Sequence, residues 1–237
     1  MMTQEQMRVL TIGAHAADQE LAAGMQIGMY ARAGHHVTIL SLTPGEKGHP
    51  SRSAAEYSLQ KLTEATRCAD ALGAESIVLN YEDTLLEATE AIKFEVADII
   101  RDIKPDVLIT HWANSIHKDH RNAHIIALDA VFYASLARIE RAKPFHRIQQ
   151  IYFSENWEDM EGFEPDLYID TSDVYKKYCE ALSCFELWNG GTGWPYADYY
   201  TSLARMRACL GGGMRWKYAA AMSRPRAAHI QRFTEWP

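Results

Sequence analysis

Two β-branched runs constrain the fold of this chain most strongly, because each leads directly into residues that can bind a metal ion. Val9-Leu10-Thr11-Ile12 precedes Gly13 to Asp18, and Val107-Leu108-Ile109-Thr110 precedes His117-Lys118-Asp119-His120. Such runs are typical of buried parallel strands, and the residues after each run predict a helix. Parallel sheets bring the carboxyl ends of their strands together in a crevice. We therefore expect the two segments to form one site.

Two imidazoles and one carboxylate, with a fourth position left for water, are the ligand set of a catalytic zinc ion. His15, Asp18 and His120 can supply that set. Zinc is favoured by the ligand types, and Fe²⁺ or Mn²⁺ are the alternatives. Asp18 could equally cap a helix, and His117, His120 and His124 could form a solvated helix face. The coincidence of two ligand-type clusters at strand ends favours the metal site, with His124 outside it.

The two segments resemble the motifs of the LmbE/PIG-L family of metal-dependent N-deacetylases, which read Ala-His-Pro-Asp-Asp-Glu and His-Pro-Asp-His. The likeness includes residues 34–39, the loop Leu42-Thr43-Pro44-Gly45-Glu46 and Leu72-Gly73, and it weakens beyond about residue 125.

The resemblance implies roles for individual residues. Zinc would be held by His15, Asp18 and His120, which match the family's ligands. His117 would stabilise the oxyanion of the reaction while paired with Asp119.

The position of the family's general base is occupied by Ala17. Because a methyl group accepts no proton, another group does this work, the reaction differs, or hydrolysis has been lost. General-base assistance is worth about 10²–10⁴-fold in rate. Glu46, in the turn after the second expected strand, is the first candidate for a replacement catalytic base. His49 and Asp119 are weaker candidates.

Further residues are candidates for binding the substrate. The resemblance places Asp83 where the family contacts sugar hydroxyls, and Lys61 where the family often has an arginine. Trp112 and Asn114 precede the second motif and could form a pocket wall and an amide hydrogen-bond partner. A core position for Trp112 and a solvated helix face for Lys61 are the alternatives. The loop 188–195 is either a lid over a sugar or a surface connection.

These residues predict a zinc-dependent amidohydrolase that removes an acetyl or other acyl group from an N-acylated amino sugar or a similar small metabolite. The alternative is a metal- or ligand-binding protein on the same scaffold, in which Ala17 marks lost catalysis. A third hypothesis is a purely structural subunit of an assembly. It would not explain why residues of metal-ligand types cluster at two strand ends.

The order of expected elements predicts the fold class. Strands are expected near residues 8–13, 36–42, 76–80, 106–110 and 149–153, and helices near 18–33, 53–72, 87–103 and 119–139. This alternation indicates an α/β, Rossmann-like fold with a mainly parallel sheet and helices on both faces. Helices are also expected near 172–188 and 196–221, with a break or kink at Gly211-Gly212-Gly213. We expect one domain, 1–237, in which 154–237 is mainly helical.

Composition and charge indicate which kinds of molecule the protein is suited to bind. The 237 residues are 47% hydrophobic and carry a net charge of −7, which suits a sizeable core and disfavours nucleic acid as a partner. Residues 155–173 contain eight acidic residues and no Lys or Arg. We interpret this acidic segment as a solvated loop, with binding of an amine product as the alternative.

Cellular location and self-association are expectations of the same kind. The chain lacks the roughly 18 consecutive apolar residues that span a bilayer, a signal sequence and paired cysteine spacing, which predicts a cytoplasmic protein with no membrane partner. The basic tail around Arg224, Arg226 and Arg232 is either solvated surface or a subunit contact in a homo-oligomer.

Overall fold

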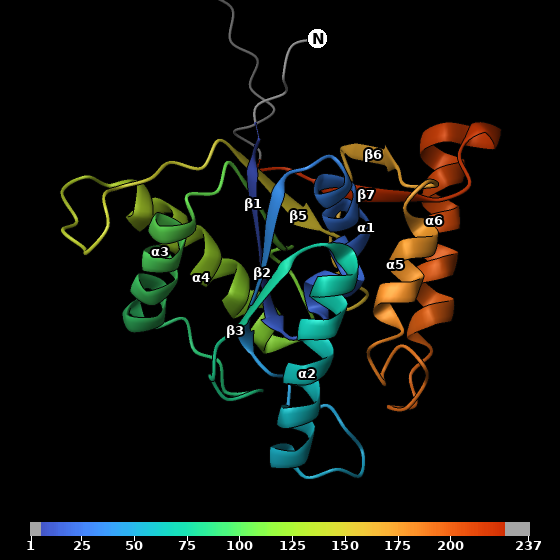
Figure 1. Cartoon of the computed structure of the whole chain (residues 1–237), viewed down its shortest axis with the longest axis horizontal. Coiled ribbons are helices and arrows are strands. Elements are labelled where there is room, and N and C mark those ends of the chain that lie inside the picture. The colour runs from blue at the N-terminus through green and yellow to red at the C-terminus, as the bar shows by residue number, and fades with distance from the viewer. Residues whose placement is uncertain (1–5, 226–237) are drawn as a thin grey trace, which may run out of the picture.

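A computed structural model describes residues 6–225 of the protein. Within that range the chain forms one sheet with helices on both sides (Figure 1). The strands are β1 (Arg8–His15), β2 (His36–Thr43), β3 (Glu75–Val78), β4 (Val107–His111), β5 (Gln150–Ser154), β6 (Leu167–Asp170) and β7 (Ala219–Ser223). The helices are α1 (Asp18–Arg32), α2 (Ala54–Leu72), α3 (Glu90–Ile103), α4 (Lys118–Ser135), α5 (Tyr175–Leu182) and α6 (Tyr196–Gly212), followed by a 3-10 turn (Gly213–Arg215).

The sheet confirms the predicted α/β fold. Its strand order is β3-β2-β1-β4-β5-β7-β6, and the strands β1 to β5 are parallel. β7 pairs antiparallel with both β5 and β6. The direction of chain progression reverses at β1, which lies between β2 and β4. Ligand-binding crevices of open α/β sheets form at such a reversal, beyond the carboxyl ends of the strands.

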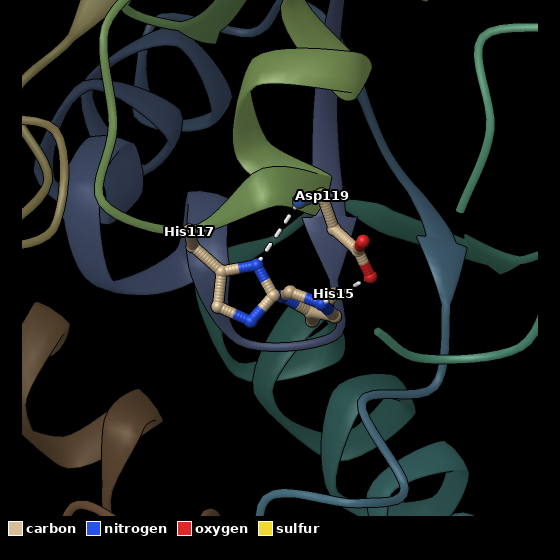
Figure 2. A group of neighbouring side chains, drawn as sticks. All are labelled: His15, His117 and Asp119. Carbon is tan, nitrogen blue, oxygen red and sulfur yellow. Dashed lines mark hydrogen bonds and ion pairs between the residues drawn. The ribbon is translucent and has the colours of Figure 1, made fainter. Parts of the chain in front are cut away.

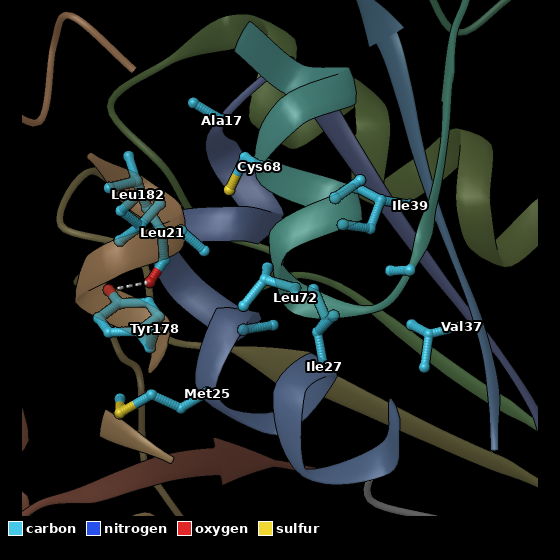
Figure 3. Packing of buried hydrophobic residues seen from close by; sticks show 14 of the residues in the cluster. Ala17, Leu21, Met25, Ile27, Val37, Ile39, Cys68, Leu72, Tyr178 and Leu182 are labelled. Atoms are coloured by element: carbon cyan, nitrogen blue, oxygen red, sulfur yellow. Dashed lines mark hydrogen bonds between the residues drawn. The ribbon is translucent and has the colours of Figure 1, made fainter. Parts of the chain in front are cut away.

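Alternate residues of β1 pack into two separate cores, because successive side chains of a strand point to opposite faces. Val9 belongs to the core that α1, α2, α5 and α6 cover, whereas Leu10 and Ile12 belong to the core under α3 and α4. Figure 3 shows the first core, where the Tyr178 hydroxyl of α5 donates to the Leu21 carbonyl of α1 at 2.8 Å. Helices from both halves of the sequence therefore hold the start of α1 in place.

The carboxyl-terminal part differs from the sequence prediction. The helix expected over 196–221 ends at Gly212, and residues 219–223 form β7 instead. Gly213 has a φ of 58°, a conformation that favours glycine. A Cβ at Gly212 would lie 2.2 Å from the Trp216 side chain, so the indole packs where only glycine fits. The predicted break at these glycines is thus a helix end, after which the chain returns to the sheet.

Within residues 6–225, none of the helices combines the length and the apolar character that a bilayer span requires. Of the basic tail, Arg224 donates its Nε to the Asp166 carboxylate at 2.9 Å, while Arg226 and Arg232 lie outside the described residues.

Candidate metal centre and active site

Three histidines meet where β1 and β4 end. His15 is the last residue of β1, His111 is the last residue of β4, and His120 lies in the first turn of α4. The ring centroids of His15 and His120 are 5.2 Å apart, and those of His111 and His120 are 4.2 Å apart. Asp18 opens α1 beside them. The two sequence segments that were expected to converge therefore do so.

The donor atoms of His15, Asp18 and His120 have the spacing of a metal site. Nδ1 of His15 lies 3.2 Å from Oδ2 of Asp18, and Nε2 of His120 lies 3.4 Å from the same oxygen. Donors bound tetrahedrally to zinc at its usual bond lengths lie about 3.3 Å apart. Moreover, Nε2 of His120 is buried without a hydrogen-bond partner. The donor types, their spacing and this unpartnered nitrogen fit a divalent metal ion.

The charges around the cluster also fit a cation. Burial lowers the pKa of His15, but Asp18, Asp119 and Asp83 outweigh burial and hold that pKa well above its ordinary value. A positive charge is therefore stabilised at this position. Burial lowers the pKa of His120 to about 4, so this imidazole is neutral at pH 7 and keeps a lone pair for a ligand bond.

His117 and Asp119 both contribute, though not as the pair that the resemblance implies (Figure 2). His117 caps α4: its Nδ1 accepts from the Asp119 backbone N–H at 3.1 Å. The Asp119 carboxylate instead accepts from the Thr84 N–H at 2.7 Å and lies 3.4 Å from Nε2 of His15. Burial, and next the charge of His15, lower the pKa of His117. Neutral His117 thus carries its proton on Nε2, and Asp119 orients His15.

A cavity of about 140 Å³ opens above the cluster. Its walls include His15, Asp18, His117 and Ala17, together with residues of the loops that follow β5 and α5. Ala17 has φ 90° and ψ −21°, a left-handed conformation that is uncommon for alanine and several-fold more frequent for aspartate. The backbone conformation therefore suits the aspartate of the family motif, although this chain has a methyl group there.

Only two of the four candidate substrate-binding residues line this cavity. Asp83 and Lys61 do so. Lys61 is 4% exposed and donates to the Ala16 carbonyl, so the alternative of a solvated helix face is wrong for it. Burial lowers the pKa of its ammonium group. Trp112 and Asn114 are absent from the cavity wall, and both side chains donate to the Glu161 carbonyl, at 3.0 and 3.3 Å.

Glu46, the first candidate for a replacement base, lies behind the cavity wall. Its Oε1 accepts from the Asp83 N–H at 2.9 Å, and it is not among the lining residues. Asp83 accepts in turn from the Lys47 N–H. Glu46 therefore holds the loop that presents Asp83 to His15.

The sequence analysis missed Glu158, which the acidic segment delivers to the cavity. Its Oε2 lies 3.3 Å from Nε2 of His120, and it lines the cavity. The Ile116 N–H and the Ser115 hydroxyl both donate to its carbonyl, which fixes its backbone. Burial, and then the charge of Asp18, raise the pKa of Glu158 to about 7. A solvated loop is thus the wrong interpretation of this part of the segment.

Asp159 and His111 were missed as well. Asp159 is 1% exposed and hydrogen-bonds His111 at 2.7 Å and His120 at 2.8 Å. Burial lowers the pKa of His111, whereas the charge of Asp159 raises that pKa and favours a second proton. The Ala14 backbone N–H nevertheless points at Nε2 of His111 at 3.0 Å, which leaves no room for a hydrogen there, so we assign a neutral ring. Both residues follow or end strands at the carboxyl edge of the sheet, a signal that the sequence does contain.

Fold and site together define an α/β protein with a histidine and carboxylate cluster suited to a divalent metal at the carboxyl edge of its sheet. The family model described as PIG-L, GlcNAc-PI de-N-acetylase, matches residues 10–131, just over half of the chain. The chain therefore belongs to the PIG-L family.

Known relatives include two kinds of enzyme. The chain is 26% identical over 222 residues to 4-oxalmesaconate hydratase of Pseudomonas putida, covering 87% of this chain and 81% of the relative. It is 29% identical over 190 residues to diacetylchitobiose deacetylase of Thermococcus kodakarensis, covering 76% and 69%.

Solved structures support the fold. The crystal structure of 4-carboxy-2-hydroxymuconate hydratase from Pseudomonas putida has a TM-score of 0.85 at 22% identity, with 98% of this chain and 100% of that chain covered. That of N,N'-diacetylchitobiose deacetylase from Pyrococcus horikoshii has a TM-score of 0.79 at 20% identity, covering 97% and 88%.

Proposed function

We propose that this protein is a metal-dependent hydrolase that removes an acetyl or other acyl group from an N-acylated amino sugar or a similar small metabolite. The observation that carries the proposal is the convergence of His15, Asp18 and His120, of which His15 and Asp18 line the cavity. These three residues would hold zinc, with Fe²⁺ or Mn²⁺ as alternatives. Such an ion, when bound, supplies a Lewis acid and an activated water. The deacetylases among the relatives support this reaction class.

His117 would stabilise the negative charge that develops on the carbonyl oxygen of the substrate. Its Nδ1 already accepts the Asp119 N–H, which leaves the Nε2–H free as a donor in the cavity wall. Removing one such donor typically reduces kcat by about 10²–10³-fold. Asp119 would act through His15, because its carboxylate faces the ring nitrogen that points away from Asp18.

Glu158 is the better placed of the two candidates for the proton transfer that Ala17 cannot perform. It lines the cavity, and its Oε2 lies 3.3 Å from Nε2 of His120, so its carboxylate reaches the place where the reaction would occur. Glu46 accepts from the Asp83 N–H and is not among the residues that line the cavity. Glu158 would therefore accept the proton of the attacking water and pass it to the leaving amine.

The test is free-amine release from a panel of N-acetylated amino sugars by the zinc-loaded protein. We expect Glu158→Gln to lose about 10²–10⁴-fold in kcat and Glu46→Gln to lose less. His120→Ala should lose zinc and activity together. Turnover only in Ala17→Asp would show a scaffold whose hydrolysis has been lost, and full activity in His120→Ala would refute the proposed centre. Tight metal binding without turnover by any variant would favour a binding protein.

A second candidate is hydration of an unsaturated carboxylate, and Ala17 favours it because this residue removes the base of the deacetylase motif. Among the residues of the range 6–225 that line the cavity, Lys61 is the one Lys or Arg, and it could bind a substrate carboxylate. The Pseudomonas relative that matches most of the chain is a hydratase. Assaying 4-oxalmesaconate beside the amino-sugar panel separates the two reactions. Lys61→Met should raise KM for the carboxylate far more than for a neutral sugar.

A further inference from the structure

Asp159 is a buried carboxylate whose two oxygens serve two different histidines. Oδ1 lies 2.8 Å from Nδ1 of His120, and Oδ2 lies 2.7 Å from Nδ1 of His111. A carboxylate can only accept hydrogen bonds. Both Nδ1 atoms must therefore carry hydrogens, and the remaining nitrogen of neutral His120, Nε2, must carry a lone pair.

The lone pair of His120 points at the proposed metal position. Nε2 is the atom that lies 3.4 Å from Asp18 and has no hydrogen-bond partner. The other tautomer would place a hydrogen there and block a ligand bond. Metal-binding histidines commonly have their free ring nitrogen held by a carboxylate for this reason.

A second contact fixes the tautomer of His111 independently of Asp159. The Ala14 backbone N–H, near the end of β1, donates to Nε2 of His111 at 3.0 Å. A backbone N–H is a donor in every state of the protein. Nε2 of His111 must therefore accept, and its Nδ1 must donate to whatever side chain lies at position 159.

We propose that Asp159 is a positioning residue which, with His111 and the Ala14 N–H, holds His120 in the tautomer that binds the metal ion. The inference rests on the metal-binding part of the proposed function. It predicts that the effect of replacing Asp159 on the tautomer of His120 and on Zn²⁺ affinity depends on whether His111 is present.

Asp159→Asn preserves shape and exposes this dependence. The asparagine has one acceptor and one donor group where the carboxylate has two acceptors. Because the Ala14 N–H keeps the hydrogen of His111 on Nδ1, the amide oxygen must accept from His111. The amide N–H₂ then faces Nδ1 of His120, which must accept, so the ring hydrogen of His120 moves to Nε2. Removing His111 as well, in Asp159→Asn with His111→Leu, frees the amide to turn its oxygen toward His120.

The first readout is the tautomer of His120 in the metal-free protein, from the ¹⁵N shifts of labelled histidine side chains. The second is Zn²⁺ affinity, measured by competition with a chelating dye. We expect Asp159→Asn to move the hydrogen of His120 to Nε2 and to weaken Zn²⁺ binding by about 10–100-fold. The double variant should recover the tautomer and part of the affinity. Glu161→Gln removes a charge from an exposed residue of the same segment and should change neither.

Rescue by the second substitution distinguishes a positioning role from a merely structural one. If Asp159 only supported the fold, a second buried substitution would lower stability and Zn²⁺ affinity further. An unchanged tautomer and unchanged Zn²⁺ affinity in Asp159→Asn would overturn the inference, as would a double variant that binds more weakly than Asp159→Asn alone. If the unaltered protein binds no Zn²⁺, the proposed function fails, and the metal-free tautomers still decide the role of Asp159.

Discussion

Replacing Glu158 with glutamine should stabilise the metal-free protein while it disables the reaction. In the folded chain, burial and then Asp18 raise the pKa of Glu158 from 4.5 to about 7. The unfolded chain ionises near 4.5, so the native state loses stability as pH rises from 4.5 to 7. A difference of this size corresponds to about 3 kcal/mol. The side chain is 19% exposed, so solvent screens this effect only partly.

The assay is urea unfolding of both proteins in chelator, from pH 4 to pH 8. At pH 4 the two free energies of unfolding should agree, because the carboxyl group is protonated in both states. At pH 8 Glu158→Gln should be more stable by about 3 kcal/mol, or about 6–12 °C in Tm. Zinc should shrink this advantage, since a nearby cation stabilises the carboxylate. Glu161→Gln, at an exposed position of the same segment, is the control.

Parallel stability curves across this pH range would refute the reasoning. They would show that Glu158 ionises as easily in the folded metal-free protein as in the unfolded chain, and that burial and Asp18 do not raise its pKa.

Two further substitutions test other parts of the structure. His117→Asn keeps an acceptor for the α4 cap but removes the Nε2–H. We therefore expect kcat to fall by about 10²–10³-fold while Zn²⁺ affinity stays unchanged. Loss of zinc in this variant would contradict the role assigned to His117. Arg101→Met should lower the free energy of unfolding by about 3–5 kcal/mol, because this 1% exposed guanidinium donates to five carbonyls around the end of α4. Arg141→Met, which breaks a partly exposed pair with Asp98 and a contact of the guanidinium with the Phe94 ring, should change the free energy of unfolding by about 1 kcal/mol or less in the same urea assay. Equal losses in the two variants would refute the argument.

The sequence by itself determined the parallel part of the sheet and the segments that meet at its edge. Apolar runs such as Val107-Leu108-Ile109-Thr110 followed by helical spacing are local signals, and parallel topology then brings His15 and His120 together. The same local logic failed at β7, because its short run of small residues pairs with β5 and β6 only after the chain has turned at Gly213.

Only the tertiary structure decided what individual side chains do. Asp119 faces His15 because the start of α4 turns its backbone N–H, and not its carboxylate, toward His117. Glu158 and Asp159 reach the cluster because the loop after β5 is fixed by hydrogen bonds from residues 112–116. Charge and spacing in a sequence identify residue types, whereas the direction of a side chain and its hydrogen-bond partners depend on contacts between segments that are distant in the chain.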